Sequence, residues 1–251
     1  MAPWLYQLFV LMLWLPLAPV YADISIDRAL VEFFHDESYY SDVNVHNHGK
    51  SRAYVAVSVL EVVNPGHADE RRLSGSQPES ALLVASPTRL VVEPGSSVPI
   101  RLHNLDESHD CERVYRVLIE PVTGKINDKR DSVRVLVSYD ILVTIRPRRT
   151  VVHVLAERRG AQITFYNSGN SHIVLEDGKQ CTGQSRDCQK IQGARLYAGT
   201  RWTTELPQAG AVSFLVNSGK TLNRQTFTGE DRLPDTSTSA PRAIGPNRPA
   251  K

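Results

Sequence analysis

The dominant pattern along residues 23–228 is an alternation of apolar and polar positions with a period of two. In the run 52–63, for example, Val55, Val57 and Val59 share one face of an extended chain. Alternation of this kind is typical of half-buried β-strands, and no stretch after residue 22 sustains a helical period. The pattern therefore predicts an all-β protein of the sandwich class, in which short strands are separated by turns.

The predicted strands fall into two groups. Arg146-Pro147-Arg148-Arg149 separates them, and because proline cannot donate to a ladder we expect a hinge near Pro147. From residue 229 the chain is rich in Pro, Ser and Thr without periodicity, so we expect a disordered tail over 229–251. The predicted domains are thus 23–147 and 148–228. The predicted strands are 23–34, 42–46, 52–63, 82–85, 90–92, 98–102, 114–120 and 133–145, followed by 151–155, 162–166, 172–176, 189–197, 201–206 and 212–216.

The first 22 residues differ from the rest. Residues 5–17 are almost wholly apolar, and Val20 and Ala22 stand at the −3 and −1 positions of a small-residue cleavage site. The apolar run is shorter than the roughly 20 residues that span a bilayer. We expect a signal peptide removed at about Ala22 and a periplasmic or secreted protein. An N-terminal anchor is the alternative, since no Lys or Arg precedes the run.

Cysteine usage fits an oxidising compartment. Cys181 and Cys188 bracket a polar loop and predict a small disulfide-closed loop. Cys111 is left over, either as a free thiol or as a partner for another chain. A zinc site would need a C-x₂₋₄-C pair or an H-x₃-H helix, and the sequence has neither, so we expect neither metal nor cofactor.

Charge and motifs exclude several function classes. The chain has 29 Lys and Arg against 27 Asp and Glu, which argues against nucleic-acid binding. No nucleophile elbow, P-loop, zincin or dinucleotide motif occurs. His46-Asn47-His48 and His35-Asp36-Glu37 are interpreted as polar turns rather than as catalytic groups. We expect a protein that is not an enzyme and, apart from its leader, does not span a membrane.

The longest predicted strand, 133–145, invites two interpretations. It is either a central strand with one face in the core, or a strand whose first half lies at a sheet edge. An exposed edge is an aggregation hazard unless function requires it, and strand addition by a partner uses such an edge. In the second interpretation Val133, Val135 and Val137 would bind the partner chain.

Arg116 is the unusual residue of the run 113–119, which is otherwise mostly apolar. It is either an edge residue whose guanidinium reaches solvent or a cation held for a carboxylate.

Several segments, in order, resemble the PapD-like periplasmic chaperones of pilus assembly. They are Ile24-Ser-Ile-Asp27, the turn at Asn47, Ser86-Pro87 through Glu93-Pro94-Gly95, Val114-Tyr115-Arg116-Val117, the strand ending in Arg146-Pro147, and Thr164 to Asn170 with Ala198-Gly199. The resemblance implies two immunoglobulin-like β-sandwich domains in tandem, arranged as an L. It also implies that residues of the donor strand, here Val133, Val135 and Val137, complement pilin or fimbrial subunits, which are then delivered to an outer-membrane usher.

One departure from the family bears on the binding site. The family anchors the subunit's C-terminal carboxylate with an Arg and a Lys, where this sequence holds Leu30 and Leu142. The missing pair, the Cys181–Cys188 loop and the Tyr115-Arg116 element resemble the divergent, alternate class. Arg116 and Arg28 are then the candidate anchors. The alternative functions are a surface adhesin or structural module with a fully paired 133–145 strand and, without any supporting motif, a secreted hydrolase.

Overall fold

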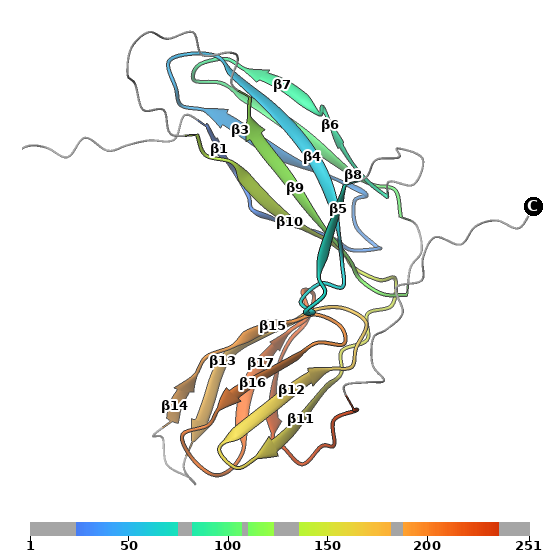
Figure 1. Cartoon of the computed structure of the whole chain (residues 1–251), viewed down its shortest axis with the longest axis vertical. Coiled ribbons are helices and arrows are strands. Elements are labelled where there is room, and N and C mark those ends of the chain that lie inside the picture. The colour runs from blue at the N-terminus through green and yellow to red at the C-terminus, as the bar shows by residue number, and fades with distance from the viewer. Residues whose placement is uncertain (1–23, 75–81, 107–109, 123–135, 182–187, 236–251) are drawn as a thin grey trace, which may run out of the picture.

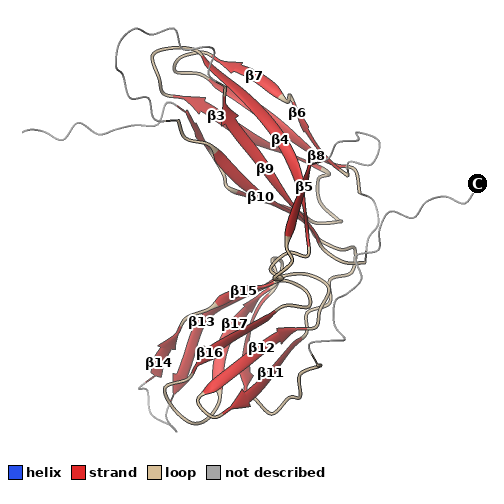
Figure 2. Cartoon of the chain, viewed as in Figure 1, coloured by secondary structure: helices blue, strands red, loops and turns tan. Residues whose placement is uncertain are grey.

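The computed structural model describes residues 24–74, 82–106, 110–122, 136–181 and 188–235, and these form strands without any helix (Figure 2). No described stretch could therefore cross a membrane as a helix. The expected signal peptide lies outside the described residues.

The first sandwich consists of a four-stranded sheet in the order β1-β3-β8-β6 and a six-stranded sheet in the order β2-β10-β9-β4-β5, with β7 also paired to β4. Every pair is antiparallel except β2 with β10, which is parallel. The strands are β1 (Ile24–Ile26), β2 (Leu30–Phe33), β3 (Tyr40–Asn47), β4 (Ala53–Val63), β5 (Arg71–Ser74), β6 (Leu83–Ser86), β7 (Arg89–Val92), β8 (Ser97–Asn104), β9 (Arg113–Pro121) and β10 (Tyr139–Ile145).

The second sandwich consists of a three-stranded sheet, β11-β12-β16, and a five-stranded sheet, β14-β13-β17-β18, with β15 paired to β13. The predicted strand 189–197 is divided here into β14 and β15, since both pair with β13 but at different positions along it. The strands are β11 (Val154–Arg159), β12 (Gln162–Asn167), β13 (Ile173–Cys181), β14 (Cys188–Ile191), β15 (Ala194–Leu196), β16 (Arg201–Glu205), β17 (Val212–Asn217) and β18 (Leu222–Phe227).

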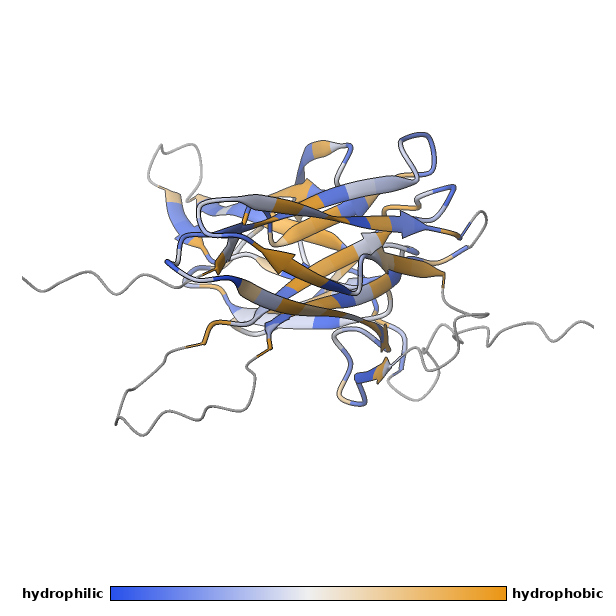
Figure 3. Cartoon of the chain, turned by 90° about the horizontal axis from the view of Figure 1, so that it is seen from above, coloured by the Kyte–Doolittle hydropathy of each residue, from blue (hydrophilic) through white to orange (hydrophobic). Residues whose placement is uncertain are grey.

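Each sandwich has its own hydrophobic core. The first core is built mainly from aliphatic residues of both sheets, whereas the second is centred on Phe165, whose ring contacts those of Trp202, Phe214 and Phe227. Hydrophobic and hydrophilic residues alternate along the strands, as the period of two predicts (Figure 3). The two sandwiches meet at an angle, so that the molecule has the shape of an L (Figure 1). The predicted fold class is confirmed.

The start of the chain corrects one prediction. The expected single strand 23–34 is interrupted, because β1 pairs with β3 in one sheet whereas β2 pairs with β10 in the other. Asp27 holds this crossover: its carboxylate accepts hydrogen bonds from the backbone N–H and the side-chain amide of Asn44, both at 2.9 Å. The first strand therefore changes sheets within three residues.

The same turn is built in both sandwiches around a buried asparagine. Asn47 donates to the carbonyl oxygens of Ser51 and Val92, and accepts from the N–H of Gly49. Asn167 repeats these bonds: its amide donates to the carbonyl oxygens of Ser171 and Leu196, and its oxygen accepts from the N–H of Gly169.

The segment expected to begin the disordered tail makes contacts instead. Glu230 forms a β-bridge with Glu157 of β11, and the carboxylate of Asp231 accepts a hydrogen bond from the N–H of Ala156. Arg201 of β16 donates to the carbonyl oxygen of Pro234. The described residues after β18 therefore follow the surface of the second sandwich as far as Pro234. Residues 236–251 lie outside the described part of the chain.

Candidate functional site

The candidate strand-binding edge lies at the start of β10. The predicted strand 133–145 is shorter in the structure: β10 begins at Tyr139, and Leu136, Val137 and Ser138 belong to no strand. The strand prediction is therefore wrong for residues 136–138. Val133 and Val135 lie outside the described residues.

The two sides of β10 are paired to different extents. On one side all of Tyr139–Ile145 pairs with β9, whereas on the other side β2 covers only Leu142–Ile145. On this second side, the N–H of Leu142 also donates a hydrogen bond to the carbonyl oxygen of Ala29, just before β2, at 3.0 Å. Among the described residues, no strand pairs with the second side of Tyr139–Ile141. The second half of the predicted strand is therefore central, whereas the beginning of β10 lies at an edge of the described sheet.

The side chains along this edge alternate between the core and solvent. Ile141 is fully buried in the first core, Tyr139 packs against that core, and the Tyr139 hydroxyl donates to the carbonyl oxygen of Ile24 at 2.7 Å. Val137 has the same parity and is half-buried, whereas Leu136 is 47% exposed. Val137 lies just before the inward-facing row of β10.

A row of paired residues crosses the outer face of the same sheet. Leu30 of β2 pairs with Leu142 of β10, and Leu142 pairs in turn with Arg116 of β9. Directly paired residues point to the same face, so the two leucines and Arg116 are neighbours on one surface. The structure therefore places Leu30 and Leu142 beside Arg116, the first candidate anchor.

Arg116 shares its acidic partner with a second arginine. The Asp140 carboxylate is 3.8 Å from Nη1 of Arg116 and 2.8 Å from Nη1 of Arg72 on β5. The Arg72 and Arg116 guanidinium groups carry two positive charges, and the Asp140 carboxylate balances one of them. Sequence reasoning missed Arg72, because only the pairing of β5 with β4 brings it to this face.

Arg28, the other candidate anchor, lies in the crossover between β1 and β2. It is exposed, and its guanidinium lies 3.5 Å from the carboxylate of its neighbour Asp27. Nothing among its described contacts joins it to Arg116.

A buried polar cluster connects the two sandwiches at the angle of the L, and we call it the joint: Glu32, Glu112, Arg146, Ser171 and His172. Arg146 is 2% exposed and lies 2.7 Å from Glu32 and 3.4 Å from Glu112. Burial raises the pKa of Glu112, but hydrogen bonds from His172 and the charge of Arg146 outweigh this effect, so the pKa lies below its ordinary value. The sequence predicted a hinge here but did not indicate its acidic and histidine members.

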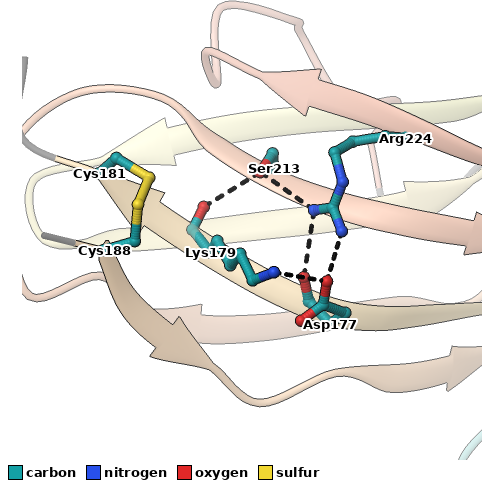
Figure 4. The surroundings of a disulfide bond; sticks show 6 residues. All are labelled: Asp177, Lys179, Cys181, Cys188, Ser213 and Arg224. Atoms are coloured by element: carbon teal, nitrogen blue, oxygen red, sulfur yellow. Dashed lines mark hydrogen bonds and ion pairs between the residues drawn. A yellow bond between two sulfur atoms is a disulfide. The ribbon is translucent and has the colours of Figure 1, made fainter. Parts of the chain in front are cut away.

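The predicted disulfide between Cys181 and Cys188 is confirmed. The two residues stand directly opposite each other on β13 and β14, with their Cα atoms 4.1 Å apart. Asp177 lies further along β13 with Lys179 and Arg224 around its carboxylate (Figure 4). Cys111 is exposed and free.

Several solved structures that are similar to this chain are chaperones of fimbrial assembly. Chaperone CfaA of class 5 fimbriae is 20% identical, with a TM-score of 0.65 over 82% of this chain and 99% of its own. The CsuC–CsuE complex of a chaperone and a tip subunit, from archaic Csu pili of Acinetobacter baumannii, is 15% identical, with a TM-score of 0.54 over 82% and 99%. The SafB chaperone in complex with SafA pilin, from Salmonella enterica, is 14% identical, with a TM-score of 0.55 over 84% and 98%.

At these identities the likeness establishes the fold, including its two domains. No family model and no curated protein sequence matches the chain.

Proposed function

We propose that this protein is a periplasmic chaperone that captures fimbrial subunits by donating a strand to them, and then delivers them to an outer-membrane usher. The observation that carries the proposal is the half-covered β10, whose side at Tyr139–Ile141 has no partner among the described strands. A partner strand added there would gain main-chain hydrogen bonds, while the alternate apolar side chains would supply apolar contacts. The fold shared with fimbrial chaperones supports the same function.

The donor residues in this proposal are Val133, Val135 and Val137. Val137, the one that the structure describes, is half-buried and in phase with the core residues Ile141 and Val143. Burying a valine side chain contributes about 1.5–3 kcal/mol, so three such residues give an appreciable part of the affinity before ordering costs.

The carboxylate anchor in this proposal is Arg116, assisted by Arg72. Their shared partner Asp140 neutralises only one of the two guanidinium groups, and Leu30 and Leu142 give the site an apolar flank. A charge-assisted bond to a terminal carboxylate is stronger than one between neutral groups. Arg28 is the weaker candidate, because its described ion pair is with the adjacent Asp27.

The test is co-expression with a fimbrial subunit of the same organism, followed by isolation of the complex from a periplasmic extract. We expect Val137→Asp to abolish recovery of the subunit, because the substitution places a charge in the apolar row. Ser138→Asp is the matched control, since Ser138 is adjacent, exposed and of the opposite parity. Equal recovery with both variants would refute the donor-strand assignment, and finding the protein outside the cell would favour an adhesin.

A further inference from the structure

Arg146 uses every one of its hydrogen-bond donors within the joint. A guanidinium group has five N–H donors and no acceptor. Nε and Nη2 donate to Glu32 at 3.2 and 2.7 Å, and Nη1 donates at 2.7 Å to both the Ser171 hydroxyl and the carbonyl oxygen of His172. The remaining donor of Nη2 points to Nε2 of His172 at 2.9 Å. That ring nitrogen must therefore act as an acceptor.

The other ring nitrogen of His172 must carry the proton. Nδ1 lies 2.8 Å from both oxygens of the Glu112 carboxylate, which can only accept. The closed joint thus requires one form of His172, neutral with its proton on Nδ1. The ring is 2% exposed, so water cannot take the place of either partner.

Among the described residues, a second proton on His172 has no acceptor within hydrogen-bonding distance. An Nε2–H would face the N–H of Arg146, and the Glu32 carboxylate oxygen lies 3.8 Å from Nε2. The Tyr197 ring also packs against the imidazole, with 5.8 Å between the ring centroids. The joint must rearrange before Nε2 can be protonated.

These contacts cross from one sandwich to the other. Glu32, Glu112 and Arg146 belong to the first sandwich, whereas Ser171 and His172 directly precede β13 of the second. The N–H of Glu112 also donates to the carbonyl oxygen of Asn170 at 2.9 Å, and the N–H of His172 donates to Glu112 at 3.2 Å. Displacement of Arg146 from His172 therefore loosens the contact between the domains.

We propose that His172 makes the joint responsive to pH: the neutral ring holds the two domains in the observed arrangement, and protonation of the ring releases it. Histidine is the side chain that ordinarily changes charge between pH 5 and 8. The inference does not depend on the proposed function, since it concerns the joint and not the strand-binding edge.

The test is amide hydrogen exchange of the purified protein, measured by NMR at pH 7.5 and at pH 5.0 and corrected for the intrinsic pH dependence of exchange. The amides of Glu112 and His172 report directly on the joint. We expect their protection to fall by about tenfold or more at pH 5.0, while core amides such as that of Val45 keep theirs. Glu112 remains ionised in this range because its pKa lies below the ordinary value of 4.5.

His172→Gln distinguishes the effect of protonating the ring from the effect of losing its hydrogen bonds. A glutamine can donate to Glu112 and accept from Arg146 but does not titrate here, so we expect protection of the Glu112 amide that no longer changes with pH. His153→Gln, at an exposed position of the same domain, should retain the wild-type response. The proposal is overturned if the wild-type protein shows no loss of protection, or if His172→Gln shows the same loss.

A second measurement needs no variant and covers the case in which His172→Gln does not fold. The ring nitrogens of His172 in the wild-type protein at pH 7.5 should show a protonated Nδ1 and a bare Nε2. A proton on Nε2 at that pH contradicts the proposal.

Discussion

Asn47 and Asn167 occupy equivalent places in the two sandwiches, and each is fully buried, with its side-chain amide joining a turn to the end of a strand of its own domain. The backbone repeats the relationship, since the carbonyl oxygens of both asparagines accept from a glycine, Gly95 in one domain and Gly199 in the other, at 2.8 Å. A buried amide with all these partners cannot be replaced without leaving carbonyl groups unsatisfied.

We therefore expect Asn167→Ala to destabilise the second domain by about 2–4 kcal/mol and to leave the first domain unaffected. Asn47→Ala should have the reciprocal effect, because the two cores are separate. Once residues 1–22 are removed, Trp202 is the one tryptophan of the chain, so its fluorescence during urea unfolding follows the second domain. Asn223→Ala, at an exposed position of β18, is the control. Loss of both transitions with either variant would contradict two independent cores.

Where His172→Gln keeps the joint closed, acid should still weaken it through Glu112. The pKa of Glu112 is lowered in the folded protein, so its contribution to stability is complete above the ordinary value of 4.5 and is lost as the pH falls through the folded pKa. We expect Glu112→Gln, made in the His172→Gln background, to flatten this step. The measurement is the protection of the amide at position 172 between pH 5.0 and 3.0. A step of unchanged size in Glu112→Gln would assign it to another carboxylate.

The anchor proposal predicts opposite effects for two neighbouring residues. Arg116→Gln should weaken capture of a fimbrial subunit by about tenfold or more, since it removes a charge-assisted bond worth about 1.5–3 kcal/mol. Asp140→Asn should strengthen capture, because it frees both Arg116 and Arg72 from their shared carboxylate. Competition with a synthetic peptide of the subunit's C-terminus, with a free or an amidated end, measures both effects. Arg148→Gln, at an exposed position beyond β10, is the control.

The disulfide should stabilise only the domain that contains it. Closing a loop of about eight residues contributes roughly 2.5 kcal/mol in the chain-entropy model. We expect the double substitution of Cys181 and Cys188 by alanine to lower the unfolding midpoint seen by Trp202, and to leave exchange at Val45 unchanged. An unaltered Trp202 midpoint would mean that the ladder between β13 and β14 holds the hairpin without the bond.

The sequence was sufficient for those features that repeat along the chain or lie close together in it. The alternation of apolar residues predicted the strands and two sandwiches, and the spacing of Cys181 and Cys188 predicted their pairing. Pattern alone could not show that the strand 23–34 changes sheets, because Ile24 and Val31 are buried in the same core from opposite sheets. The outward pairing of Leu30, Leu142 and Arg116 also depends on a parallel register between distant segments.

The joint was beyond sequence reasoning for a different reason. Glu112 and His172 are single polar residues beside apolar runs, and nothing local distinguishes them from exposed ones. Their role arises from the angle between two domains, which brings them together across 60 residues of sequence. Asp36 and Glu37 are similar, since a turn expected to be merely solvated pairs with Lys220 of the other domain.

The crossover at Asp27 directs the chain's own N-terminal residues away from the uncovered start of β10. The residues just before β2 would cover the start of β10 if they continued the parallel pairing of β2 with β10. The pairing stops at Leu30 because the preceding chain lies beside β3 instead. The two bonds from Asn44 to Asp27 hold the first strand beside β3 and away from the uncovered part of β10. An incoming strand and the chain's own N-terminal residues would compete for the same backbone groups. The uncovered part of β10 therefore depends on a carboxylate that lies outside β10 itself.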